Sequence, residues 1–341
     1  MTSPTLDIIV PVWNHPTEAR ACLVSILDCA ATARLIIINN GCDRATELML
    51  EEFSDHLGDR AIYMTMERNI GFVPAVNRAL NRSDADWSVI VRPTGTLTTE
   101  CYQQILETTA KECAGIITPH CPSEHPLPAR LLKSDCSCLE TCEISFALLA
   151  LSHTMRTTIG LFDEEMDGGT WCLQDYRHRA DAHDFRTYLL PKVAALGEPI
   201  TIFGSRERRR IMDEAAITTF RQRWGAQQQL ALYLPKDTDE HTLKETLELL
   251  HAAARHGHRL NLFLHRRQYT QALQSGAACL HSGITLHRLP LLTPLKSLAR
   301  SMETLKLQYP QLQPVCGLDG IPFPGYDNAL PTALLQQLAK P

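Results

Sequence analysis

The sequence of 341 residues has no apolar run long enough to cross a membrane. Its start, Met1 to Pro4, lacks the basic and apolar regions of a signal peptide. We therefore expect a cytoplasmic protein whose 12 cysteines are mostly reduced thiols. Positive charge is not in excess either, because the formal net charge is −5. This excludes a nucleic-acid binder that relies on a globally basic surface.

Several catalytic and metal motifs are also missing, since the chain has no HExxH motif and no paired CxxC spacing. Cys136, Cys138 and Cys142 come closest to a zinc motif, but Cys136 and Cys138 would project to opposite sides of a strand. We expect scattered thiols there. The arginines between residues 206 and 210 either form a solvated helix face or bind diphosphate, an acidic glycan or an anionic membrane surface. Peripheral membrane contact therefore remains an open alternative.

What the chain does contain is typical of a globular protein, with 44% hydrophobic and 21% charged residues. Up to residue 120, apolar segments alternate with helical patterns, which predicts an α/β fold with a doubly wound parallel sheet. Residues 119 to 141 interrupt this alternation with a proline-rich loop, and long loops are often functional. The alternation restarts after Gly225. We therefore predict a domain at 1–225 and a smaller α/β domain of unknown role at 226–341.

Three segments of the first domain indicate ligand binding. The run from Leu6 to Asn14 reads as a buried strand that ends in a loop, and Pro16 then opens a helix. A second apolar strand ends at 39–43 in Asn-Asn-Gly-Cys-Asp, and residues 68–77 read Arg-Asn-Ile-Gly-Phe-Val-Pro-Ala-Val-Asn. In an open parallel sheet, ligands bind in the crevice beyond the carboxyl ends of the strands.

Together these segments resemble family 2 glycosyltransferases, which have the GT-A fold and use nucleotide-sugars. The resemblance implies that the nucleotide is bound by Pro11, Asn14, Asn39, Asn69, Gly71 and Asn77. Asn39 stands where the family has an acidic residue that binds the nucleobase, and an amide can still donate to and accept from a base edge. The alternative is that Asn39, Asn40 and Gly41 only build a tight turn.

The family's metal-binding aspartate motif is absent. The strand at 88–91 runs into Arg92-Pro93-Thr94, where Thr94 occupies the aspartate position. Mg²⁺ and Mn²⁺ need carboxylate oxygens, so we predict no metal site in this loop, although either ion could still accompany the nucleotide. Arg92 and Thr94 are the diphosphate candidates, because a guanidinium can neutralise phosphate charge directly. The equal alternative is a site that has lost both its metal and its catalysis.

A later segment resembles the family's acidic helix. Residues 160–165 read Gly-Leu-Phe-Asp-Glu-Glu, and Asp175 follows in a polar helix. Sugar transfer with inversion needs a carboxylate within hydrogen-bond reach of the acceptor hydroxyl, and Asp175 is the predicted general base. Another register places Leu173 at the base position. The family's histidine beyond the next strand is replaced by Gly197.

The resemblance implies an enzyme that transfers a sugar from a nucleotide-sugar to a hydroxyl of a glycan, lipid or protein acceptor. The main alternative is a catalytically inactive GT-A domain that binds a nucleotide-sugar, a glycan or a protein partner. A third reading is a two-domain scaffold whose interface alone matters.

Overall fold

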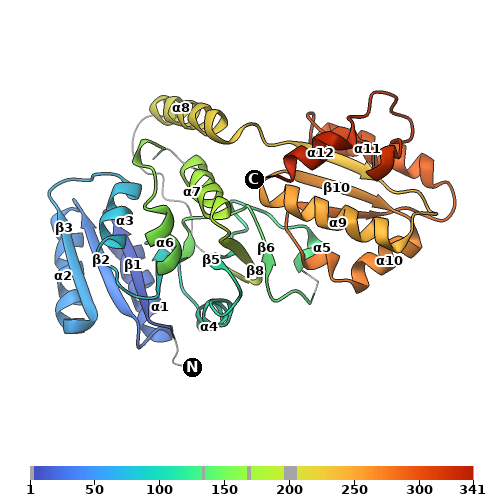
Figure 1. The fold of residues 1–341 in the computed structure, drawn as a ribbon. Helices are drawn as coiled ribbons and strands as arrows, with labels where there is room; N and C mark the ends of the chain where they lie inside the picture. Colours follow the sequence, from blue (N-terminus) through green and yellow to red (C-terminus); the bar gives the residue numbers. More distant parts are fainter. Residues whose placement is uncertain (1–3, 133–134, 167–169, 196–205, 341) are drawn as a thin grey trace. The chain divides into compact units, whose positions relative to one another are not determined.

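The computed structural model describes residues 4–132, 135–166, 170–195 and 206–340 (Figure 1). The chain divides into two compact units. The first comprises Met1–Cys138 and Glu143–Gly225, and the second comprises Leu139–Cys142 and Ala226–Pro341. None of the described helices is long and apolar enough to span a membrane.

The first unit is built on one large sheet. Its strands are β1 (Leu6–Val12), β2 (Arg34–Asn40), β3 (Ala61–Met66), β4 (Trp87–Val91), β5 (Ala114–His120), β7 (Leu148–Ser152) and β8 (Arg186–Ala194). They follow the order β3-β2-β1-β4-β7-β5-β8. Neighbouring strands are parallel except at β7, which is antiparallel to β4 and β5. The strands up to residue 120 run in the same direction, as expected, whereas β7 runs the opposite way because the chain re-enters the sheet after the proline-rich loop.

Helices cover both faces of this sheet (Figure 1). They are α1 (Pro16–Cys29), α2 (Arg44–Leu57), α3 (Phe72–Leu80), α4 (Thr99–Thr108), α5 (Ala129–Leu132), α6 (His153–Ile159), α7 (Thr170–Ala182) and α8 (Arg206–Trp224). Successive strand residues point to opposite faces. Ile8 and Val10 accordingly pack with α1, α2 and α4, whereas Ile9 packs with α3, α6 and α7.

The strand directions fix where a site can form. β1, β2 and β4 are parallel, and β5 runs the same way because β7 is antiparallel to both β4 and β5. Their carboxyl ends therefore share one edge of the sheet. The loops that begin at Trp13, Gly41, Arg92 and Cys121 all leave from this edge.

The second unit has a smaller, parallel sheet in the order β11-β10-β9-β12. Its elements are β9 (Gln229–Tyr233), α9 (Glu240–Arg255), β10 (Arg259–Leu264), α10 (Arg266–Gln274), β11 (Ile284–Arg288), α11 (Pro294–Gln308), β12 (Gln313–Val315) and α12 (Thr332–Leu338). The short strand β6 (Leu139–Glu140) also belongs to this unit.

Glu140 explains why β6 is held in the second unit. The Arg255 guanidinium donates to both carboxylate oxygens of Glu140, from Nε at 2.6 Å and from Nη2 at 2.7 Å. Burial alone would raise the pKa of Glu140, but these hydrogen bonds outweigh it and bring the pKa to about 2. The sequence pattern gave no sign of this excursion, because it depends on a residue more than a hundred positions away.

Candidate functional site

The loops that follow β1 and β2 are joined by Asn14. Its Oδ1 accepts a hydrogen bond from the backbone N–H of Asp43 at 2.7 Å, and its own N–H donates to Cys42 Sγ at 3.3 Å. Asn14 has a φ of 56°, a left-handed conformation that asparagine tolerates. Pro11 lies buried in β1 beyond the last residue that pairs with β4, so its missing N–H leaves no gap in the sheet.

Asn39 builds the turn at the end of β2. Its side chain is buried, with 2% of the residue exposed. Oδ1 accepts from the backbone N–H of Cys42 at 2.8 Å, and Nδ2 donates to the Tyr63 hydroxyl at 3.2 Å. These contacts match the turn-building alternative. Any contact between the Asn39 amide and a base edge would have to share or replace them.

Asn40 and Gly41 bind this turn to the loop before α3. A Cβ on Gly41 would come within 2.4 Å of backbone atoms of Arg68 and Asn69, and its φ is 71°. Only glycine fits both conditions. Asn40 Nδ2 donates to Asn69 Oδ1 at 3.1 Å and to the Gly71 carbonyl at 3.0 Å. Asn40 thus holds the turn after β2 against the loop before α3.

Asn69 and Gly71 shape that loop from within. Asn69 Oδ1 accepts from the Gly71 N–H at 2.9 Å, and Gly71 has a φ of 101° at the start of α3. The structure therefore brings Pro11, Asn14, Asn39, Asn69 and Gly71 to one edge of the sheet.

Asn77 lies elsewhere. It is buried in α3, where Nδ2 donates to the Phe162 carbonyl at 2.9 Å and to Glu164 Oε1 at 3.0 Å. Its Oδ1 accepts from the Phe162 N–H at 3.1 Å. Asn77 thus fastens the turn at 160–165 to α3, and its amide does not face the strand ends.

Arg92 follows β4 and meets a carboxylate that its own loop lacks. Its Nη2 donates to Glu124 Oε1 at 2.7 Å, and Ser145 donates to Glu124 Oε2 at 2.6 Å. Burial alone would raise the pKa of Glu124, but the Ser145 hydroxyl and the Arg92 guanidinium outweigh it and lower the pKa below its usual value. Arg92 Nη1 is buried and has no hydrogen-bond partner. Thr94 lies half-buried in the same loop.

Glu124 is the residue that sequence reasoning missed. It belongs to the proline-rich loop after β5, which the sequence marked as functional without indicating which side chain would reach Arg92. The Arg92 side chain is only 12% exposed, so the ion pair is partly shielded from water. The guanidinium thus has one anionic partner and one unused buried N–H.

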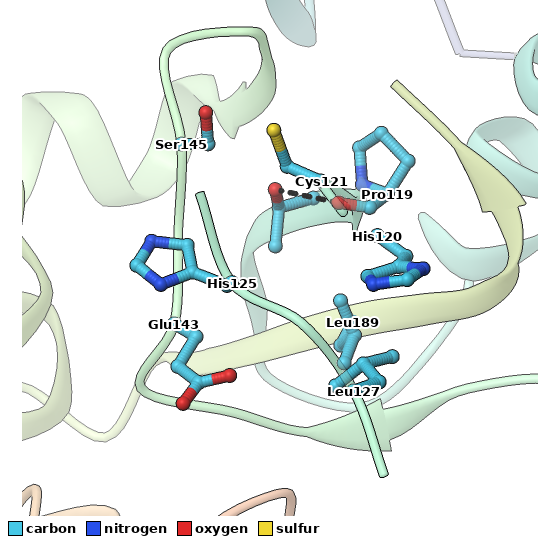
Figure 2. Close-up of a pocket in the computed structure, with 9 residues that line it drawn as sticks. Pro119, His120, Cys121, His125, Leu127, Glu143, Ser145 and Leu189 are labelled. Carbon is cyan, nitrogen blue, oxygen red and sulfur yellow. Dashed lines mark hydrogen bonds between the residues drawn. The ribbon is translucent and has the colours of Figure 1, made fainter. Parts of the chain in front are cut away.

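A small pocket adjoins this ion pair (Figure 2). Its cavity volume is only about 10 Å³, and it is lined by Thr118, Pro119, His120, Cys121, His125, Leu127, Glu143, Ser145 and Leu189. His120 Nε2 is buried without a hydrogen-bond partner. Burial also lowers the pKa of His120, so its imidazole is neutral at pH 7. Among the described residues, no group of three His, Cys, Asp or Glu side chains could hold a metal ion.

Asp175 does not line this edge as an accessible carboxylate. It is 0% exposed, and Oδ2 accepts from Arg179 Nε at 2.9 Å. Oδ1 accepts from Trp224 Nε1 at 2.9 Å and from Arg223 Nη1 at 3.2 Å. Both oxygens are thus covered by donors from α7 and α8. In this structure neither oxygen is open to an acceptor hydroxyl, and the role of Asp175 as general base stays a prediction.

The other expectations have simpler outcomes. Leu173, the alternative base position, is a buried apolar residue of α7 and cannot take a proton. Gly197 lies outside the described residues. In the arginine run at 206–210, the described side chain is Arg210, which is exposed and pairs with Glu214 at 2.6 Å. Cys138 and Cys142 are free thiols as expected, whereas Cys136 is disulfide-bonded, so the expectation fails there.

Residues 7–126 match the model of glycosyl transferase family 2. This segment lies within the first unit and is similar to a family 2 glycosyltransferase domain. The matched segment includes the loops after β1, β2 and β4 and also Glu124, but it ends before Asp175. No curated protein matches the chain.

Two solved structures show the fold. The mannosyltransferase PcManGT from Pyrobaculum calidifontis, in complex with GDP-Man and Mn²⁺, is 13% identical with a TM-score of 0.52. That match covers 91% of this chain and 83% of the mannosyltransferase. S. aureus TarS 1-349 in complex with UDP-GlcNAc is 14% identical with a TM-score of 0.50, covering 63% of this chain and 66% of TarS 1-349. The first unit has the GT-A fold, and the second unit has a smaller α/β sheet.

Proposed function

We propose that the family 2 domain binds a nucleoside diphosphate-sugar at the carboxyl edge of its sheet and transfers the sugar to an acceptor hydroxyl. The observation that carries this proposal is Arg92, a shielded guanidinium with an unused N–H at the end of β4. The family match supports sugar transfer, and the two similar structures contain nucleotide-sugars, GDP-Man and UDP-GlcNAc.

The nucleoside would lie on the joined loops that carry Pro11, Asn14, Asn39, Asn69 and Gly71. Since their amides hold one another, we expect the loops to act chiefly as a preformed surface. A preformed surface loses little conformational entropy on binding. Asn77 is not part of the proposed site.

Arg92 would bind the diphosphate, with Thr94 nearby in the same loop. A guanidinium presents five donors in a rigid plane and pairs with phosphate through two parallel hydrogen bonds. Nη2 is engaged by Glu124, whereas Nη1 is buried and unpaired. A phosphate oxygen at Nη1 would supply the missing partner, and the phosphate charge would then compete with Glu124 for the guanidinium.

The acceptor hydroxyl would lose its proton to His120, and the pocket would have to open for this step because His120 Nε2 is buried. A neutral imidazole with an unpaired ring nitrogen can accept a proton near pH 7, and the pocket lies directly beside the Arg92–Glu124 pair through Ser145. Replacing the ring in His120→Gln should therefore abolish sugar transfer and leave nucleotide binding intact. Unchanged turnover in this variant would remove His120 from the mechanism.

A second candidate function is nucleotide-sugar binding without transfer. The covered carboxylate of Asp175 and the absence of an acidic residue in the loop from Arg92 to Thr96 favour it. The distinguishing experiment incubates the purified full chain with a panel of nucleotide-sugars, with and without simple glycoside acceptors. Acceptor-dependent release of nucleoside diphosphate supports the transferase. Saturable binding of a nucleotide-sugar without release supports the second candidate.

A further inference from the structure

The second unit displays an apolar loop between β11 and α11. Leu291 is 72% exposed, Leu292 is 83% exposed and Leu295 is 52% exposed. The loop is anchored on both sides, because Leu289 and Leu298 are buried in the core of the unit. We call residues 290–295 the leucine loop. Contiguous exposed apolar side chains of this size mark interaction surfaces more often than chance.

The backbone of the leucine loop is strained at Thr293. Thr293, a β-branched residue, has φ 57° and ψ 47°, and its side chain makes no capping hydrogen bond to α11. A left-handed conformation is costly for such a residue. Pro294 then fixes the first turn of α11. This turn thus combines exposed leucine side chains with an unfavourable backbone conformation at Thr293.

Positive charge surrounds this loop. No aspartate or glutamate occurs between residues 249 and 302, although the whole chain has a net charge of −5. Arg288 and Lys296 are exposed immediately beside the loop, and Arg300 is exposed one turn further along α11. Leu264 pairs with Arg288 across the sheet, so the exposed Arg266 and Arg267 leave from the same edge.

We propose that the leucine loop docks the protein on an anionic lipid bilayer. The leucines would enter the boundary between head groups and acyl chains, while the flanking arginines and lysine contact lipid phosphates. A second copy of the chain fits less well. A two-fold contact through this face would bring its own basic side chains together, and no acidic residue of residues 249–302 could compensate for them. This docking is independent of the proposed nucleotide site.

The experiment uses the full chain and two kinds of vesicle, pure phosphatidylcholine and an equal mixture of phosphatidylcholine with phosphatidylglycerol. Sedimentation with the vesicles measures binding. We expect binding to the anionic vesicles only, and an at least roughly tenfold weaker partition for the double variant Leu291→Ser, Leu292→Ser, because transfer of two leucines contributes at least that much. Arg288→Gln with Lys296→Gln should weaken binding by a similar factor.

The matched control is Leu307→Ser. Leu307 is 86% exposed near the end of α11, outside the leucine loop, and its replacement should leave sedimentation unchanged. Circular dichroism of every variant checks that the fold is retained. Equal binding of wild type and the Leu291, Leu292 double variant would overturn the proposal, as would no binding to anionic vesicles. A concentration-dependent dimer that disappears in the double variant would overturn it in favour of self-association.

Discussion

The predicted effect of replacing Asp175 separates a structural role from a catalytic one. Asp175→Ala removes a carboxylate that is 0% exposed and leaves Arg179 and Trp224 Nε1 without their acceptor. Removing one partner of a buried ion pair costs about 3–5 kcal/mol. Arg223 still has Asp163 as an ion-pair partner, and its side chain is 41% exposed, so water can solvate it. The loss of Asp175 therefore costs Arg223 little free energy. We therefore expect the lower end, about 3 kcal/mol.

This free energy should appear as a shift in the thermal transition of the first unit. For a unit of this size, about 1 kcal/mol corresponds to roughly 2–4 °C in Tm. Asp175→Ala should thus lower Tm by about 6–12 °C, as followed by scanning calorimetry or circular dichroism. Asp163→Ala is the matched control, because Asp163 is 20% exposed and shares Arg223 with Asp175. Its loss should cost only about 1 kcal/mol.

The opposite pattern would refute the structural role. If Asp175→Ala kept the wild-type Tm while sugar transfer fell by orders of magnitude, Asp175 would be the accessible base expected from the sequence. The contacts from Arg223 and Trp224 would then have to open during turnover.

The remaining predictions concern the nucleotide site and the domain division. Asn39→Ala should weaken nucleotide binding by about 1–3 kcal/mol, measured by calorimetric titration, because the Cys42 N–H and the Tyr63 hydroxyl lose the amide that holds the turn. Unchanged affinity would remove Asn39 from the site. Glu124→Gln should strengthen nucleoside-diphosphate binding several-fold, because the competing anion on Arg92 is lost. Because the pKa of Glu124 is lowered, its carboxylate stays ionised and competes for Arg92 at every pH above the usual pKa range of glutamate. The competition is lost only as the pH falls through that lowered pKa. Equal affinities of Glu124→Gln and wild type at neutral pH would contradict the competition. Limited proteolysis should cut near Gly225, within about ten residues, before it cuts inside β3 or α4, because loops between compact units are cleaved first.

The elements that sequence reasoning located well are those with a strong local pattern. β1 and β2 are continuous apolar runs because both faces of a parallel strand must be buried. The restart of alternation after Gly225 is a second pattern of this local kind. The direction of β7 depends on how the preceding loop returns, and no local pattern encodes it.

The site shows the same limit at the level of side chains. The strand-end loops could be placed from the sequence, because the carboxyl ends of parallel strands meet at one edge. Their partners could not. Glu124 reaches Arg92 from 32 residues away, and Arg223 reaches Asp175 from 48 residues away. Such pairings depend on tertiary packing, so the sequence alone could not show that Asp175 is buried and surrounded by donors.

The measurement that tests the central claim most directly is a titration of nucleoside diphosphate into wild type and Arg92→Ala, first with Mn²⁺ and then with chelator. If Arg92 carries the phosphate charge, wild-type affinity will be nearly the same in both conditions. Arg92→Ala will lose about tenfold or more for the diphosphate but little for the nucleoside, as expected for one charged hydrogen-bonded pair. Arg20→Ala, which removes an exposed arginine of α1, will match wild type. A tenfold or greater loss on chelation, with Arg92→Ala unaffected, would contradict the assignment and indicate a metal-dependent site.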